Sequence, residues 1–441
     1  MKGVFIMQLT QATPKVFTKY QVFIISLLAI LQFTVILDFI VISPLGAQLL
    51  KELHIATAQF GFVVSVYAFS AGISGILAAG FADKFDRKKL LLFFYVGFIV
   101  GTLCCGIAPD YNFLLAARIV TGVFGGVMNS IIFTIVTDLF KQEVRGRVMG
   151  YVQMAFATSQ ILGIPLGLYL TNIWGWHSPF LMIAGLSIFV AIAILIYMRP
   201  IIAHLSIKQD RNPFQHIQKT ITKPLYLNAF LATAILIIGG FMLMPFSSAF
   251  TVNNLGVSIK HLPLVYLVTG IFSMIVSPML GKITDKLGKF NLFAVATILG
   301  IIIVLIFTNL GITPLWGVMA LNVFLSVAIL SRMISSSTLM TMIPEIQERG
   351  AFMSISSSIQ QIAGGIASIC AGLIVSQTST GLINHFNILG YIVSAFMVVT
   401  IVMIYFIERA VLQKAKTSQS QQLPKIENNN AELIPEEMET K

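Results

Sequence analysis

The chain has 441 residues, of which 57% are hydrophobic and only 10% are charged. A soluble globular protein carries roughly 25% charged residues, so this composition excludes an ordinary water-soluble fold and indicates a chain that faces lipid. The formal net charge of +11 would by itself allow a nucleic-acid binder, but the charges gather in loops and tails, and we expect no nucleic-acid partner.

Twelve stretches of the sequence are long and apolar enough to cross a bilayer, which needs about 20 mostly apolar residues. Turn residues at 172–179, 308–314 and 376–387 divide the longest uncharged intervals into two spans each. The predicted spans are 22–43, 57–80, 90–107, 113–136, 148–170, 180–198, 226–250, 264–281, 292–307, 316–342, 351–375 and 388–407. The sequence therefore predicts an all-α integral membrane protein with twelve transmembrane helices.

A polar and basic segment at 199–224 divides the spans into two groups of six. We predict an N-terminal six-helix bundle at 1–198, this segment as a linker, a second bundle at 225–410 and a disordered tail at 411–441. The halves repeat one another, because AGFADKFDRK at 79–88 aligns with GKITDKLGKF at 281–290, an offset of 202 residues. Arg145-Gly146 aligns likewise with Arg349-Gly350, and such repeats are typical of secondary transporters.

The basic residues are distributed unequally between the two sides of the predicted membrane. Of 28 Lys and Arg residues, 24 fall in loops and tails on one side, and only Lys51 and Lys260 fall on the other. By the positive-inside rule both termini are cytoplasmic, in a bacterial inner membrane. The first apolar stretch has no small-residue cleavage site, so we expect a retained helix and not a signal peptide.

The three cysteines, Cys104, Cys105 and Cys370, all lie in predicted spans. This placement indicates neither a disulfide framework nor a metal site. The sequence has no GxxxxGK[ST] nucleotide-binding loop and no clustered nucleophile and base. We therefore expect neither an enzyme nor a cofactor.

The loop after the second span carries Asp83, Lys84, Arg87 and Lys88. It resembles the signature motif of the major facilitator superfamily, although Asp86 stands where a glycine is usual. The resemblance covers the chain from the first span to the twelfth and implies the major facilitator fold.

This resemblance also implies a cytoplasmic gate with four members. Asp83 would lie near the N-terminus of the eleventh helix, where the helix dipole stabilises an anion, and Asp285 is its second copy. Arg87 would pair with Asp138 at the inner end of the fourth helix. The alternative is that the basic residues of the motif only set the topology.

The fourth and fifth spans carry further family patterns. Arg118 with Gly122 resembles the R-x-x-x-G pattern of the fourth helix, and Gly122 and Gly126 form a GxxxG face for close packing. In the fifth span Gly163, Pro165 and Gly167 resemble the signature of the drug:proton antiporter branch, in the form found in sugar-efflux and multidrug-efflux proteins. A proline between small residues could equally bend and pack a helix with no role in export.

Charges inside the membrane are costly and are functional candidates. Three occur, namely Asp38, Arg118 and Arg332. We predict that Asp38 takes up the coupling proton and that Arg118, at a similar depth, is its partner; the alternative is a permanent ion pair. Arg332, with Gln360 and Gln361 of the eleventh span, is predicted to line the substrate cavity, although Arg332 could instead hold helices together.

The favoured function is a secondary active transporter that exports small organic molecules or drugs in exchange for protons, by alternating access. The alternatives are a proton-coupled symporter or a facilitator that imports a small nutrient, and a transporter-like sensor. The expected partners are the lipid bilayer, a small-molecule substrate and protons, and we expect a monomer.

Overall fold

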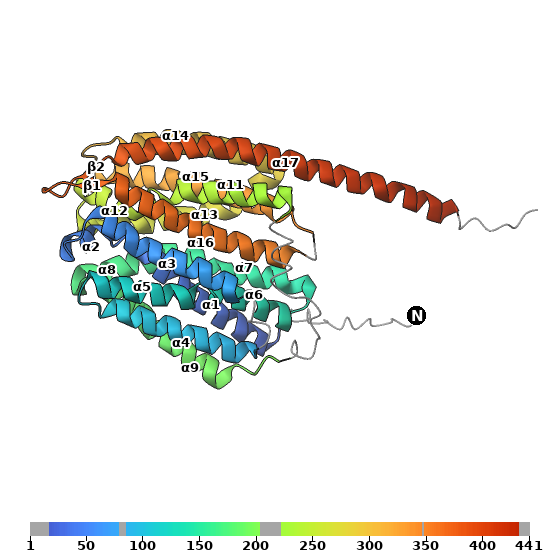
Figure 1. The fold of residues 1–441 in the computed structure, drawn as a ribbon, viewed down its shortest axis with the longest axis horizontal. Coiled ribbons are helices and arrows are strands. Elements are labelled where there is room, and N and C mark those ends of the chain that lie inside the picture. Colours follow the sequence, from blue (N-terminus) through green and yellow to red (C-terminus); the bar gives the residue numbers. More distant parts are fainter. Residues whose placement is uncertain (1–16, 79–84, 203–221, 346–347, 432–441) are drawn as a thin grey trace, which may run out of the picture.

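The computed structural model describes residues 17–78, 85–202, 222–345 and 348–431 of the chain. Twelve helical segments within these residues are long and apolar enough to cross a membrane. They lie side by side in one elongated bundle (Figure 1). The prediction of an all-α membrane protein with twelve spans is confirmed.

The first half contains six of these spans, two of which are interrupted. Its elements are α1 (Lys19–Val41), α2 (Gly46–Glu52), α3 (Thr57–Ala78), α4 (Arg87–Gly106), α5 (Tyr111–Gly125), α6 (Met128–Leu139), α7 (Gln142–Thr158), the π-helical turn η2 (Ser159–Gly163), α8 (Ile164–Trp174) and α9 (Ser178–Tyr197). The fourth span is α5 followed by α6, and the fifth is α7, η2 and α8. The π turn lies just before Pro165, which lacks an N–H and cannot continue a regular helical hydrogen-bond pattern.

The second half has the same six-span organisation. It contains α11 (Pro224–Phe241), α12 (Met244–Asn253), η4 (Ile259–His261), α13 (Leu262–Leu287), α14 (Lys289–Thr308), α15 (Leu315–Met340), α16 (Arg349–Ile374), β1 (Ser376–Gln377), β2 (Ile383–Asn384) and α17 (Phe386–Ala431). Here the seventh span is the interrupted one, with α11 followed by α12. The strands β1 and β2 form a short antiparallel hairpin between α16 and α17.

The last helix extends into the segment for which the sequence predicts a disordered tail. A disordered tail is expected from residue 411, whereas α17 continues as a helix to Ala431 and projects beyond the bundle (Figure 1). Residues 408–423 contain one Glu, two Ala, two Leu, four Gln and two Lys, all of good helix propensity. The preceding membrane span already provides the nucleus that an isolated polar segment would lack.

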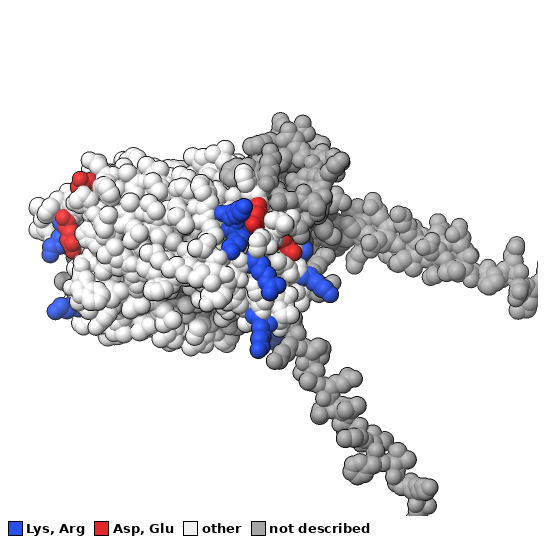
Figure 2. All heavy atoms as spheres, turned by 90° about the horizontal axis from the view of Figure 1, so that it is seen from below, with Lys and Arg blue, Asp and Glu red and all other residues white. Residues whose placement is uncertain are grey.

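The bundle has two distinct ends. We call the end where α1 begins and α17 leaves the bundle the termini end, and the opposite end, which carries α2, β1 and β2, the hairpin end (Figure 1). On the face shown in Figure 2, the Lys, Arg, Asp and Glu side chains lie near the two ends, and the belt between them is uncharged. Such a belt fits the hydrocarbon core of a bilayer.

The two halves are held together at the hairpin end. Ser248 Oγ donates a hydrogen bond to the carbonyl oxygen of Ser43 at 2.9 Å, and Ser43 Oγ in turn donates to the carbonyl oxygen of Met244. Thr57 Oγ1 of α3 donates to the carbonyl oxygen of Val375 at 2.6 Å. These contacts join the first and second spans to the seventh and eleventh, so the halves are closed against each other at this end.

Toward the termini end, α1 and α16 expose side chains. Val22, Ser26 and Ile30 are exposed along one face of α1, whereas every residue from 31 to 41 is buried or half-buried. In α16, Ser357 and Gln360 are exposed on a face other than the one that exposes Leu373. The buried residues are also divided at this end. A separate cluster around Phe230, Phe293 and Phe352 lies at the termini end of the second half, apart from the main core.

Candidate functional site

The two intramembrane charges of the first half meet in its interior. Arg118 Nη1 of α5 donates to Asp38 Oδ2 of α1 at 2.8 Å and to the Asp38 carbonyl oxygen at 3.2 Å. Both side chains have zero exposure. The predicted pairing of Asp38 with Arg118 is therefore present as a buried ion pair between the first and fourth spans.

Other helices complete the surroundings of this pair. Thr102 Oγ1 of α4 donates to Asp38 Oδ1 at 3.2 Å, so both carboxylate oxygens accept a hydrogen bond. The guanidinium lies over the ring of Tyr67 of α3, with Cζ 4.4 Å from the ring centroid. A cation held over an aromatic face is stabilised by the quadrupole of the ring. Nε and Nη2 of Arg118 have no hydrogen-bond partner among the described residues.

Glycines allow α5 to approach α3 closely enough for these contacts. A Cβ atom at Gly122 would lie 2.5 Å from the carbonyl oxygen of Tyr67, and one at Gly126 would lie 2.4 Å from the carbonyl oxygen of Ala71. Both distances are too short for any side chain. The predicted GxxxG face thus packs α5 against α3, and it places Arg118 over Tyr67.

The fifth-span motif packs against α1 on both sides of Asp38. A Cβ atom at Gly163 would lie 2.6 Å from Leu37 Cδ1, and one at Gly167 would lie 3.3 Å from Val41 Cγ2. Pro165 lies between these glycines, immediately after the π turn. The motif therefore helps to position the segment of α1 that carries the carboxylate.

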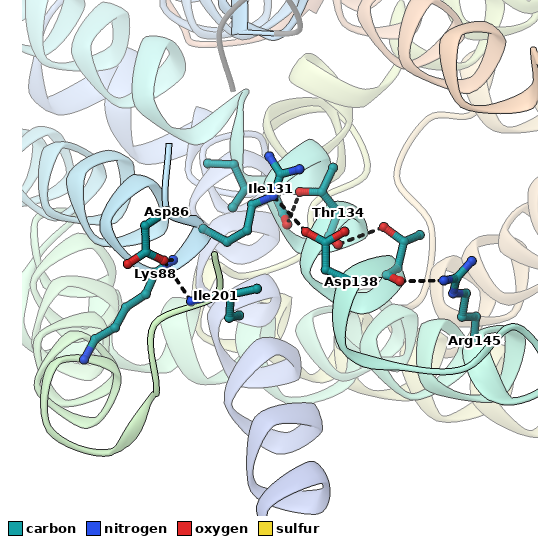
Figure 3. A network of polar contacts seen from close by, with 9 residues as sticks. Asp86, Lys88, Ile131, Thr134, Asp138, Arg145 and Ile201 are labelled. Atoms are coloured by element: carbon teal, nitrogen blue, oxygen red, sulfur yellow. Dashed lines mark hydrogen bonds and ion pairs between the residues drawn. The ribbon is translucent and has the colours of Figure 1, made fainter. Parts of the chain in front are cut away.

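At the termini end the first half contains a second ion pair. Arg87 Nε at the start of α4 donates to Asp138 Oδ2 near the end of α6 at 2.9 Å, and their side chains are 4% and 20% exposed. Figure 3 shows Asp138 with Arg145, which donates to the carbonyl oxygens of Thr137 at 2.6 Å and Phe140 at 2.9 Å. The arrangement ties α4, α6 and α7 together.

The remaining members of the predicted gate are not described at the level of side chains. Asp83 lies outside the described residues, and Asp285 belongs to α13 but its side chain is not described. Asp86, which replaces a usual glycine of the motif, is the N-cap of α4 and also accepts a hydrogen bond from the Ile201 backbone N–H at 2.9 Å (Figure 3). This departure from the motif is therefore explained by a cap.

In the second half the predicted cavity residues lie on two helices. Arg332 of α15 is 3% exposed; its Nη2 donates to Thr400 Oγ1 of α17 at 3.2 Å, and Cζ lies 5.5 Å from the centroid of the Phe293 ring of α14. Gln360 of α16 is exposed and Gln361 is half-buried. Arg332 thus points into the second half, and its place in a substrate cavity stays a prediction.

Several polar residues at the site were not singled out from the sequence. Thr102 and Tyr67 contact the ion pair, and Gln32 Nε2 of α1 donates to Asn129 Oδ1 of α6 at 2.5 Å, which gives the first and fourth spans a second polar contact. The signal in the sequence that could have identified these residues was an amide or hydroxyl side chain in an apolar span.

Within the described residues, no group of three or more His, Cys, Asp or Glu side chains is placed to hold a metal ion.

Comparison with known proteins agrees with this architecture. The family model described as Major Facilitator Superfamily matches residues 28–346. Over 259 residues the chain is 27% identical to the uncharacterised MFS-type transporter YceJ of Bacillus subtilis, a match that covers 58% of this chain and 65% of that protein. It is 24% identical over 285 residues to Multidrug resistance protein 2 of Bacillus subtilis, covering 63% of this chain and 70% of that protein.

A solved structure has the same fold at low sequence identity. It is a bacterial homologue of the human lysosomal transporter Spinster in an inward-facing and unoccupied conformation, with a TM-score of 0.73 and 16% identity. The superposition covers 90% of this chain and 98% of that one. Since the family model spans well over half of the sequence and the twelve spans form two six-helix halves, this chain is a transporter of the Major Facilitator Superfamily.

Proposed function

We propose that this transporter exports small organic molecules in exchange for protons, and that Asp38 is the residue that carries the proton. The observation that supports this proposal most directly is the buried ion pair between Asp38 and Arg118, with a distance of 2.8 Å and no exposure of either side chain. Ionisable residues inside the membrane are costly and rare, and they mark substrate and ion pathways and proton relays.

The geometry suggests how proton binding would be linked to movement. Ionised Asp38 holds Arg118 through two acceptors, its carboxylate and its own carbonyl oxygen. Protonation would remove the negative charge and weaken the bond between α1 and α5, because a neutral carboxyl attracts a guanidinium far less than a carboxylate does. A ligand shifts a conformational equilibrium only through unequal affinity for its states, and the proton would have that unequal affinity here.

Two features favour export. The Gly163, Pro165 and Gly167 motif resembles that of drug:proton antiporters, and one relative is named Multidrug resistance protein 2. The alternative is proton-coupled import, or facilitated import, of a small nutrient. The same buried pair would serve a symporter, so the direction of transport relative to the proton separates antiport from symport. Dependence on the pH gradient separates both from a facilitator.

The termini end is proposed to face the cytoplasm, because 24 basic residues fall on that side against two on the other. A reporter fused after Lys441 should then be cytoplasmic, and one inserted at 172–179 should be external. An external reporter at Lys441 would reverse the assignment. With the proposed orientation, the closed hairpin end faces outward.

We further propose that Arg87, Asp138, Asp83 and Asp285 form a gate at the cytoplasmic end. The 2.9 Å ion pair between Arg87 and Asp138 supports the part of this gate whose side chains are described. It links the start of the third span to the end of the fourth, so its rupture would loosen the end of the first half.

Gln360, exposed on α16, remains a candidate for contact with substrate.

Transport by purified protein in proteoliposomes with an imposed pH gradient tests the function. Uptake of labelled drug-like cations and sugars is followed into vesicles, with the proton gradient oriented both ways. Substrate movement opposite to the proton flow supports antiport, and movement in the same direction establishes symport instead. Transport that is indifferent to the gradient would make the protein a facilitator and remove the proposed role of Asp38.

A further inference from the structure

Among the residues whose side chains are described, none that contacts the buried arginine of the second half is a carboxylate. Glu408 is the one acidic residue within the six spans of that half. It lies about 12 Å along α17 from Thr400, at about 1.5 Å per residue, and its Oε1 accepts a hydrogen bond from the Phe290 backbone N–H at 3.1 Å. Arg332 itself is 3% exposed and donates to the neutral hydroxyl of Thr400.

Two buried donors near this arginine lack partners among the described residues, namely Arg332 Nε and Ser335 Oγ. Ser335 follows Arg332 by three positions on α15, so the two side chains lie on the same face of the helix. Ser335 is 1% exposed. The Thr400 hydroxyl cannot serve as a further donor, because it already donates to the Met397 carbonyl oxygen at 2.7 Å.

These donors require an acceptor with negative charge. A guanidinium stays protonated in proteins, and a buried charge is normally paired with an opposite charge. The Phe293 ring, 5.5 Å from Cζ, offers only the weak attraction of a quadrupole. The unpartnered N–H and O–H groups are therefore the donors that a bound anion would use, and Arg332 also contacts α14 and α17.

We infer that Arg332 and Ser335 bind a small monovalent inorganic anion of the size and charge of chloride. Two donors suit a monovalent halide better than a multiply charged sulfate or phosphate, which needs more donors. Because Arg332 contacts α14 and α17 of its own half, the anion would be a resident ion that neutralises the second half. This inference does not depend on the direction of transport or on proton coupling.

The test is the thermal stability of the purified full-length protein in detergent, measured in sodium chloride and in sodium gluconate at equal ionic strength. Wild-type protein should show a saturable rise in Tm with chloride of roughly 2–4 °C. Arg332→Met should abolish the response, and Ser335→Ala should shift it to higher chloride concentration. Ser65→Ala, a matched change at a buried serine of the first half that donates to the Gly61 carbonyl oxygen, should keep the wild-type response.

Equal Tm values for wild-type protein in the two salts would overturn the site, as would a full chloride response in Arg332→Met. If Arg332→Met cannot be purified, Ser335→Ala carries the test, since it retains the arginine. Crystals grown in bromide provide an independent measurement. An anomalous peak within hydrogen-bonding distance of Arg332 Nε is expected, and bromide peaks confined to other places would contradict the inference.

Discussion

The two halves of this transporter repeat the same six-span unit but treat their buried arginines differently. Arg118 in the first half meets a carboxylate at 2.8 Å. Arg332 in the second half meets a hydroxyl at 3.2 Å and an aromatic ring. One half thus pairs its buried arginine with a carboxylate, and in the other half the buried arginine contacts neutral groups among the described residues.

The offset of the repeat shows that Arg332 is not the second-half copy of Arg118. With an offset of 202 to 204 residues, Asp38 corresponds to 240–242 and Arg118 to 320–322, and neither range contains a charged residue. The repeat therefore specifies the frame of helices, and the charges were placed in each half separately. This asymmetry is why the first half is the better candidate for proton coupling.

The halves also differ in the ion pairs at their termini ends. Arg87 and Asp138 of the first half are 4% and 20% exposed. Lys223 and Glu348 of the second half lie 2.6 Å apart but are 38% and 16% exposed. Since solvent screens an exposed pair, the first half should depend more on its pair than the second half does.

The strongest test of the comparison is Asp38→Asn. Asparagine has the shape of a protonated carboxyl but cannot titrate, so substrate exchange should persist while accumulation driven by a pH gradient is abolished. The uncompensated Arg118 should also lower stability by about 3–5 kcal/mol. Transport is measured in proteoliposomes and stability by thermal unfolding.

The matched control for this change is Asp110→Asn, because Asp110 is an exposed N-cap of α5 and asparagine caps equally well. It should leave both accumulation and stability close to wild type. Gradient-driven accumulation at the wild-type level by folded Asp38→Asn protein would reduce the buried pair to a structural contact.

Arg87→Ala should have the next largest effect. It leaves Asp138 without its guanidinium, and the loss of stability should fall below the roughly 3–5 kcal/mol of a fully buried pair because Asp138 is 20% exposed. Transport should fall as well if the pair acts as a gate. Arg87→Lys is the informative companion, since it keeps the charge but loses the directed Nε–H bond; an unchanged transport rate in both variants would remove the gate.

Thr400→Asp would place a carboxylate beside Arg332. The new side chain would replace a hydroxyl that lies 3.2 Å from Arg332 Nη2, and should neutralise the arginine permanently. We expect Tm in gluconate to rise by roughly 2–4 °C and the chloride response to disappear. Thr400→Asn, of similar shape but uncharged, should do neither; the same rise in both variants would show that packing, and not charge, is responsible.

The smallest effect is expected from Lys223→Met. The hydrogen bond to Glu348 raises the pKa of Lys223 above its usual value of 10.5, so the pair stabilises the protein fully below that value. The contribution, at most about 1 kcal/mol for so exposed a pair, is lost as the pH rises through the folded-state pKa. The difference in Tm between wild type and variant should be constant from pH 6 to pH 9 and should shrink above pH 10.5; a difference that grows at high pH would contradict this assignment.

The sequence alone determined the membrane architecture and the small set of candidate residues. A bilayer requires each span to be an unbroken apolar segment of fixed length, so the twelve spans can be recognised from local composition. Because the hydrocarbon core of the bilayer also makes charged residues rare within spans, Asp38, Arg118 and Arg332 could be recognised as candidates. The pairing of Arg87 with Asp138 came from a motif and not from composition.

The contacts that these side chains make are visible only in the folded protein. The sequence did not indicate that Arg332 contacts α14 and α17, and its predicted place in a substrate cavity stays a prediction. The sequence also gave no sign that Gly163 and Gly167 pack beside Asp38. Thr102 and Tyr67 join the ion pair from two further helices. The physical reason is that hydropathy acts on each segment separately, whereas the direction of a side chain within a bundle depends on the rotation and close packing of helices that are distant in the chain.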